Sequence, residues 1–132
     1  MSEIIIKIEP TFFQIQKGGN EFTGYEITTN NQTIQFGIRT GQSCCENYGY
    51  FSSEDDLNQF IGAELLDIQL TDTALNTNKL EKQNFSDYVN LMFVTFKTNK
   101  GVFQLTVYND HNGYYGHDAV IISQQLKLTE NL

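Results

Sequence analysis

The chain has no tryptophan, one proline, two cysteines, and no apolar run near the ~20 residues that cross a bilayer. Its N-terminal segment, Met1–Lys7, has no cationic stretch before the apolar residues and no small-residue cleavage site, so no secretory signal is expected. We therefore predict a cytoplasmic protein without a membrane partner. The hydrophobic content of 39% suits a globular domain and is too high for a disordered chain.

Cysteine chemistry is limited to the neighbours Cys44 and Cys45. Adjacent cysteines can bridge only through a strained ring, so we expect reduced thiols and no disulfide framework. The first interpretation is that one of them is buried as a small hydrophobic residue. Two alternatives stay open, a zinc site with His111, His117 or Asp110 and a thiolate nucleophile paired with a histidine. Because neither has supporting spacing or motifs, we predict no metal, no cofactor and no catalytic residue.

Positive charge is also scarce. Lysine and arginine number 8 against 16 acidic residues, which gives a formal net charge of −8, and Arg39 is the only arginine. Binding to bulk nucleic acid or to an anionic membrane needs a basic surface, so neither is expected. A single small anion remains compatible, because a few backbone N–H groups and one cation can hold a phosphate. Arg39 is the preferred anion contact, and pairing with a surface carboxylate is the alternative.

Alternation of apolar and polar residues is the dominant pattern. A period of two, with β-branched and aromatic residues, predicts half-buried strands. Tyr88–Thr98 is the most continuously apolar segment and is predicted to be a central strand. The complete set of expected strands is Met1–Lys7, Phe12–Gln16, Glu21–Thr29, Ile34–Ile38, Leu66–Leu70, Tyr88–Thr98, Phe103–Val107 and Ala119–Leu128.

Turn-forming residues lie between these segments, at 17–20, 30–31, 99–101 and 111–113. Because these residues tolerate positive φ, they can form tight turns between consecutive strands. The expected topology is therefore a mostly antiparallel sheet or meander of about seven to eight strands. Pro10 follows the first expected strand and leaves the later strands uninterrupted.

One short helix is predicted between residues 52 and 62, with an N-cap at Ser52 or Ser53 and a stop at Gly62. It should be about two turns long and pack on the sheet through Leu57, Phe60 and Ile61. Residues 76–87 are expected to form a loop anchored by Leu80 and Phe85. Because no linker or repeat divides the chain, residues 1–132 should form a single mainly β (α+β) domain.

Two segments contain residues that strands do not require. Arg39–Tyr50 and Tyr108–Asp118 mix tyrosines, glycines and amides, a combination that can stack a planar ligand and hydrogen-bond its edges. A purely structural interpretation also stands, because the same residue types form turns and strand ends, and one of Tyr114 and Tyr115 should face the core. The predicted ligand-binding residues are Arg39, Cys45, Glu46, Asn47, Tyr48, Tyr50, Asn109, His111, Asn112, Tyr114 and Tyr115.

Four short motifs suggest a relationship. They are Ser-Cys-Cys-Glu at 43–46, Leu-Asn-Gln-Phe-Ile-Gly at 57–62, Asn-Lys-Gly at 99–101 and Asn-Gly-Tyr-Tyr at 112–115. With them the chain, from about Ile34 to Ile121, resembles a family of small phage and prophage proteins known only as a domain of unknown function. Ser43 replaces an acid that is frequent in that family, and the strand with Gln104 and Thr106 lacks its basic and tryptophan positions, so contacts from that strand are not carried over.

The resemblance implies a phage or prophage origin and a β-rich fold with one short helix. Small phage proteins of this size include sponges that sequester the nucleotide signals of bacterial immune systems. Our hypothesis is therefore a non-enzymatic binding protein that sequesters a cyclic nucleotide or a related small anionic ligand, with tyrosines stacking on bases and Arg39 meeting phosphate. It requires Arg39, Tyr48 and Tyr115 to lie on one face.

A homo-oligomer is expected, because a small sheet has edges to protect and a two-sided ligand suits a symmetric interface. The alternative function is a protein-interaction module that inhibits a host or phage protein through an acidic or tyrosine-rich face. A third possibility is a hydrolase or thiol enzyme that would use Cys44 or Cys45 with His111 or His117.

Overall fold

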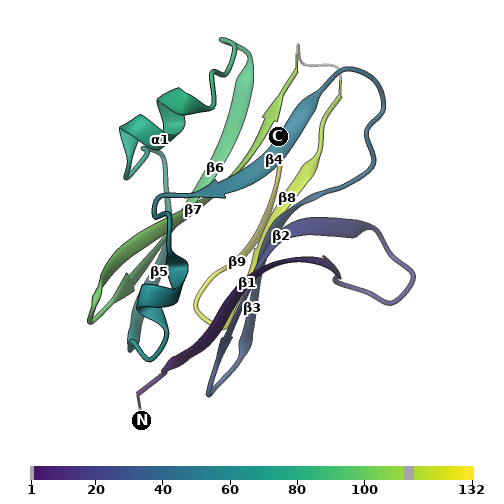
Figure 1. Ribbon diagram of the computed structural model, residues 1–132. Coiled ribbons are helices and arrows are strands. Elements are labelled where there is room, and N and C mark those ends of the chain that lie inside the picture. The colour runs from purple at the N-terminus through teal and green to yellow at the C-terminus, as the bar shows by residue number, and fades with distance from the viewer. Residues whose placement is uncertain (1, 112–114) are drawn as a thin grey trace.

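The computed structural model describes residues 2–111 and 115–132. In this part of the chain nine strands form two antiparallel sheets that pack face to face, which confirms the mainly β prediction (Figure 1). One sheet has the order β1-β2-β3-β8-β9 and the other the order β4-β7-β6-β5. The strands are β1 (Ile5–Gln14), β2 (Glu21–Thr29), β3 (Thr33–Arg39), β4 (Asn47–Ser52), β5 (Leu65–Thr71), β6 (Val89–Thr98), β7 (Gly101–Asp110), β8 (Asp118–Ile122) and β9 (Lys127–Asn131).

Three strand predictions need correction. The two strands expected before residue 17 are one strand, β1, which runs through Pro10; β1 is the outer strand of its sheet, where a proline is tolerated. The segment 119–128 is divided between β8 and β9, because Ser123 and Leu126 close a turn through the Ser123 N–H and the Leu126 carbonyl, 3.0 Å apart. β4 was absent from the expected set, because its Tyr-Gly-Tyr pattern suggested a ligand-binding segment instead.

The core lies between the two sheets and contains the side chains that the alternation pattern predicts. Ile34, Phe36 and Ile38 of β3 are fully buried. Phe96 and Phe103 stack at the centre, with ring centroids 4.9 Å apart and planes 4° apart. β6 lies between β7 and β5, which confirms that the most apolar segment is an interior strand.

A smaller apolar cluster covers the outer face of the five-stranded sheet, where Phe13, Phe22 and Val120 are buried together. Gly24 and Gly37 are opposite each other in β2 and β3. A Cβ at Gly37 would lie 3.0 Å from the Phe13 ring, and a Cβ at Gly24 would overlap the carbonyl oxygen of Phe36. Gly24 therefore allows β2 and β3 to approach closely, and Gly37 leaves space for the Phe13 ring.

The predicted two-turn helix is a single 3-10 turn, η1 (Leu57–Phe60). Asp56 caps it, with a side-chain oxygen 2.9 Å from the N–H of Asn58. The predicted cap at Ser52 is not formed, because Ser52 is the last residue of β4. Phe60 is buried, and Leu57 and Ile61 pack against the core as expected. Gly62 follows with a φ of +86°, as a stop residue should.

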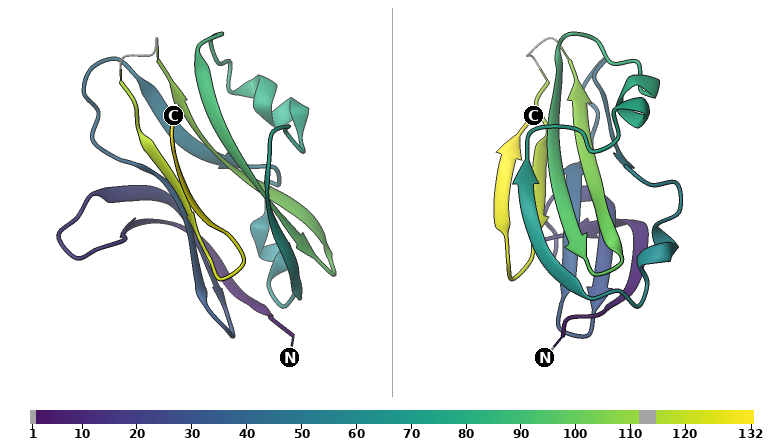
Figure 2. Two further views of the ribbon diagram at one scale, coloured as in Figure 1. Left: turned by 180° about the vertical axis from the view of Figure 1, so that it is seen from behind. Right: turned by 90° about the vertical axis from the view of Figure 1, so that its left-hand side faces the viewer.

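Residues 76–87 contain a helix, α1 (Thr77–Lys82), where a loop was expected. Asn76 starts it by accepting a hydrogen bond from the N–H of Lys79, at 3.2 Å. The helix and the segment after it lie on the outer side of the four-stranded sheet (Figure 2). Phe85 anchors this segment as predicted, with its ring centroid 4.5 Å from that of Tyr108. No helix in the described ranges is long and apolar enough to span a membrane.

Candidate functional site

The described parts of the two candidate segments meet at one end of the sandwich, where the β3–β4 connection, residues 115–117 and Leu132 come together (Figure 1). His117, just before β8, lies at the centre of this end and is only 1% exposed. Its Nδ1 is 2.6 Å from the carbonyl oxygen of Arg39, and its Nε2 is 3.3 Å from a carboxylate oxygen of Glu46. His117 therefore links the main chain at the end of β3 to the Glu46 carboxylate.

Tyr48 completes the environment of His117. The tyrosine and imidazole rings stack, with centroids 4.2 Å apart and planes inclined by 29°. The Tyr48 ring thus covers one face of the imidazole, whose two nitrogens contact Arg39 and Glu46. Tyr48 therefore packs against a residue that is distant in the sequence, His117.

Glu46 is turned inward and is 2% exposed. Its carboxylate accepts hydrogen bonds from the N–H groups of Cys44, at 2.8 Å, and Ser43, at 3.2 Å. Burial acts to raise the pKa of this carboxyl, but the N–H groups of Cys44 and Ser43 and the contact with His117 outweigh it and lower the pKa to about 2. Glu46 is therefore a carboxylate at neutral pH, and it closes the turn at 43–46 onto His117.

Cys44 and Cys45 are both exposed and are joined by a disulfide. This corrects two expectations, that the thiols are reduced and that one cysteine is buried in the core. The inward position in this turn belongs to Glu46, because its carboxylate can be satisfied there by two N–H groups and His117. Within the described ranges, no three histidine, cysteine, aspartate or glutamate side chains are placed to hold a metal ion.

Arg39 ends β3 and is half-buried. Its Nη2 donates to the carbonyl oxygen of Gly116 over 3.4 Å. The ion pairs of the described residues join Lys7 to Glu9, Lys79 to Asp55 and His117 to Glu46, so none involves Arg39. The alternative, a pairing of Arg39 with a surface carboxylate, is therefore not found among the described residues.

Asn109 of β7 is fully buried and holds the β7–β8 connection. Its Nδ2 donates to the carbonyl oxygens of Tyr115, at 2.7 Å, and Leu132, at 3.1 Å. His111 works beside it: Nδ1 accepts from the N–H of Tyr115 at 3.2 Å, and Nε2 is 3.0 Å from the Leu132 carbonyl oxygen. The Oδ1 atom of Asn109 has no hydrogen-bond donor among the described residues.

The remaining predicted residues are spread over several environments. Tyr50 packs edge-on against Tyr25 of the core, with centroids 5.0 Å apart and planes at 74°. Asn47 is exposed at the start of β4. Asn112 and Tyr114, and with them the turn at 111–113 and the orientation of Tyr114 relative to Tyr115, lie outside the described residues.

Arg39 and Tyr48 meet at this end without sharing a face, so the single face of Arg39, Tyr48 and Tyr115 that the hypothesis required is not formed, and any site beside Arg39 excludes Tyr48. Ile38 points into the core, so alternation along β3 turns Arg39 to the outer side of its sheet. Tyr48 instead packs against the core and reaches the Arg39 main chain only through His117. Tyr115 is linked to Arg39 more directly, because Arg39 bonds the carbonyl of the next residue, Gly116.

Sequence reasoning named His117 only as a possible metal ligand or base, and missed that it links the two segments. Its position directly before a predicted strand was the available signal. The predicted residues thus form two groups in mutual contact. One contains Arg39, Glu46, Tyr48 and His117, and the other contains Asn109, His111 and Tyr115. The bond from Arg39 to Gly116, next to Tyr115, connects the two groups.

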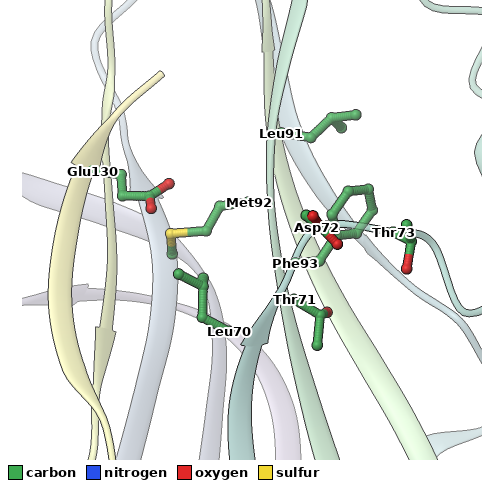
Figure 3. A pocket seen from close by; sticks show the side chains of 8 residues that line it. All are labelled: Leu70, Thr71, Asp72, Thr73, Leu91, Met92, Phe93 and Glu130. Carbon is green, nitrogen blue, oxygen red and sulfur yellow. The ribbon is translucent and has the colours of Figure 1, made fainter.

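A hollow of about 680 Å³ lies elsewhere, at the side of the sandwich (Figure 3). Its lining comes from the end of β5, the first half of β6 and one residue of β9, namely Leu70, Thr71, Asp72, Thr73, Leu91, Met92, Phe93 and Glu130. None of the predicted ligand-binding residues lines it.

Residues 2–121 match a family described as a domain of unknown function, DUF7448. No curated protein and no solved structure matches the chain.

Proposed function

From the premise that the chain belongs to the DUF7448 family, whose function is undefined, we propose a function from geometry: a non-enzymatic binding protein that sequesters a cyclic nucleotide or a related small anionic ligand beside Arg39. A phage anti-defence sponge is the biological setting that this implies. The observation that carries it is the state of Arg39, the only arginine of a chain with a net charge of −8 and yet without a carboxylate partner in the described residues.

A guanidinium without a carboxylate partner among the residues that the structure describes is available to an anion. Its planar donors fit two phosphate oxygens at once, whereas a lysine offers only a point charge. The long bond from Arg39 to Gly116, at 3.4 Å, orients the side chain without neutralising it. A phosphate at this position would give Arg39 a negatively charged partner, which it has in none of the ion pairs of the described residues.

The planar part of such a ligand would stack on the half-buried Tyr115, next to Gly116. A base stacked on an aromatic side chain contributes about 1–3 kcal/mol. Asn47, exposed at the nearby start of β4, would offer an amide to a base edge. Four buried or half-buried residues hold the main chain around this site through hydrogen bonds to Cys44, Tyr115 and Arg39. They are Glu46, Asn109, His111 and His117.

The proposal is tested by ligand recovery. Purified protein is incubated with a panel of cyclic di- and trinucleotides and cyclic ADP-ribose isomers, freed of unbound ligand by filtration, and heat-denatured. Intact ligand released only on denaturation is the expected result. A chemically altered ligand would indicate an enzyme, and an empty result over the whole panel would contradict the nucleotide proposal.

A matched pair of variants places the site. Arg39→Ala should weaken binding of the recovered ligand at least about tenfold, since a charge-assisted contact to phosphate is worth about 1.5–3 kcal/mol. Lys17→Ala removes a positive charge from the exposed β1–β2 turn and should leave the affinity unchanged. Equal losses in the two variants would point to a general charge effect.

Light scattering tests the homo-oligomer that belongs to this proposal, because a two-sided ligand suits a symmetric interface. A monomer both with and without ligand would remove that part. The alternative, a protein-interaction module, is favoured by a different observation, an open strand edge at the side of the sandwich.

A further inference from the structure

β6 has an open edge along its first half. β5 pairs with β6 from Leu65 opposite Thr98 to Thr71 opposite Phe93, and it ends there. Residues Val89–Met92 of β6 continue beyond that point, paired only with β7 on the other side. One side of this four-residue segment therefore has no strand opposite it.

The main-chain groups of Leu91 face this open side. Asn99, just past the end of β6, donates its N–H toward β5, to the carbonyl oxygen of Glu64 at 3.1 Å. Successive residues of an antiparallel strand turn their N–H and C=O groups to opposite sides. The main-chain groups of the odd-numbered residues of β6 therefore point toward β5. Phe93 still has Thr71 opposite it, and Leu91 is the next residue in the series.

The chain is drawn away from this edge after Thr71. The buried side chain of Gln104 donates to the carbonyl oxygen of Thr73 at 2.9 Å and accepts from the N–H of Leu75 at 2.9 Å. Gln104 is on β7, so these bonds carry residues 73–75 across the outer face of the sheet. The edge stays uncovered for a structural reason, since the segment that could have extended β5 is held elsewhere.

Two hollows lie on either side of the open edge and share Leu91. The first, of about 680 Å³, has Leu70, Met92 and Glu130 pointing toward one another on its inner side (Figure 3). The second, of about 300 Å³, lies on the outer side between β6 and α1, lined by Leu80, Glu81, Asn84, Phe85, Val89 and Leu91. Successive side chains of an added strand would point alternately into the two hollows.

The charge around the edge has one sign. Asp72 and Glu130 line the first hollow and Glu81 lines the second, and no lysine or arginine lines either. The ion pairs of the described residues include none of these three acids. Basic side chains in an incoming segment would therefore find partners, whereas a second copy of this acidic chain would meet like charge.

Two of the outer strands, β1 and β5, carry protective features. β1 has Pro10 within it and an irregular register between Ile5 and Lys7, and β5 has one between Leu65 and Asp67. Prolines, lysines and bulges are the usual means of blocking strand addition. The open segment of β6 reads Val-Asn-Leu-Met and has none of them.

We propose that the open edge of β6 at Val89–Met92 binds an extended segment of a partner protein, rich in alternating apolar and basic residues, as an added β-strand. Main-chain bonds to Leu91 would provide affinity, and the two hollows with Asp72, Glu81 and Glu130 would select the side chains. This surface does not involve Arg39, so it is independent of the proposed nucleotide site.

The probe is an acetylated and amidated peptide with the sequence Lys-Val-Lys-Val-Lys-Val, titrated into the isotope-labelled full chain. We expect saturable binding that weakens with salt, together with slower hydrogen exchange at the Leu91 amide. Two control peptides should bind at least about tenfold more weakly: Glu-Val-Glu-Val-Glu-Val, which reverses the charge, and the lysine peptide N-methylated at every second residue, which loses its outward N–H groups.

Protein variants separate this edge from other surfaces. The double variant Asp72→Asn, Glu130→Gln should lose about fivefold in affinity at low salt, the upper range for partly exposed charge pairs. Glu9→Gln, on β1, and Arg39→Ala should bind the peptide like the unmodified protein. Circular dichroism checks that all variants are folded.

Several results would overturn the proposal: no binding of the lysine peptide, equal binding of the N-methylated or glutamate peptide, or unchanged exchange at Leu91. Protection of Leu91 that rises with protein concentration in the absence of peptide would instead assign the edge to a second copy of the chain.

Discussion

At the scale of single residues, Glu46 couples the fold to pH. Its pKa is about 2 in the folded protein against an ordinary value of 4.5. As pH falls below 4.5 the unfolded chain takes up the proton first, so the stabilisation from Glu46 is present above 4.5 and is lost as pH falls toward 2. Glu46→Gln should reduce the slope of unfolding free energy against pH in that window by about one proton.

Urea unfolding between pH 2 and 6 measures this slope, with Glu81→Gln, an exposed side chain of α1, as the control. An unchanged slope in Glu46→Gln, or an equal change in both variants, would contradict the role of the buried carboxylate.

Asn109 gives a second prediction at this scale. Replacing it with leucine removes the donor to the part-buried carbonyl oxygen of Tyr115 and one of the donors to the carbonyl oxygen of Leu132, which keeps the N–H of His117. The expected loss in unfolding free energy is about 1–3 kcal/mol. Asn78→Ala, at an exposed position of α1, should change it by less than about 0.5 kcal/mol. Chemical denaturation compares the two, and similar values would argue against a structural role for Asn109.

Residue types alone identify which parts of the chain form this end of the molecule, but not which way each side chain points. Arg39, Glu46 and Tyr48 stand close together in the sequence and were predicted as one segment. The inward position of Glu46 depends on His117, which is 71 residues away. No local pattern carries that information, so the sequence could not distinguish a buried support from a ligand contact.

At the scale of strands and helices, strongly periodic segments were predictable and weakly periodic ones were not. Ile34–Ile38 and Phe103–Val107 alternate cleanly, and both are strands. α1 has six residues and none of them is buried, so it leaves no apolar stripe to read. η1 is shorter than predicted because β4, unrecognised in the sequence, uses the residues up to Ser52.

The close pairing of β2 and β3 at Gly24 yields a prediction for an element. Gly24→Ala places a methyl group against the Phe36 carbonyl, a main-chain atom that cannot rotate away. We expect a loss of about 3 kcal/mol or more, the upper range for overpacking. Gly18→Ala is the control: nothing lies within 4 Å of its added Cβ, and only the φ of +80° is unfavourable, at about 1–2 kcal/mol. Thermal and urea unfolding measure both.

If Gly24→Ala were no more destabilising than Gly18→Ala, the two strands would not be as closely packed at this point as the overlap indicates.

For the whole molecule, the excess of acidic residues predicts a response to salt. With a net charge of −8, the folded chain is destabilised by self-repulsion, which ions screen. Raising sodium chloride from about 10 mM, where the Debye length is about 30 Å, to about 1 M, where it is about 3 Å, should raise the urea midpoint. A falling midpoint would show that favourable ion pairs outweigh the repulsion.

The division into two sheets is also a property of the whole molecule, and the sequence did not reveal it. Hairpins such as β6–β7 are visible because a turn signal lies between their strands. The pairing of β3 with β8, which places Gly37 opposite Val120, joins segments that share no turn and no common period. A meander was therefore the simplest topology to predict, although the chain crosses between the two sheets.

Pro10 has a consequence for the behaviour of many copies at high concentration. β1 exposes Ile6 and Phe12, which are 54% and 65% accessible, on an outer strand of ten residues. A long apolar edge of this kind is a template on which further chains can stack into fibrils. Because Pro10 has no N–H group, any strand laid along the centre of β1 meets an interrupted row of donors, which limits fibril growth from this edge.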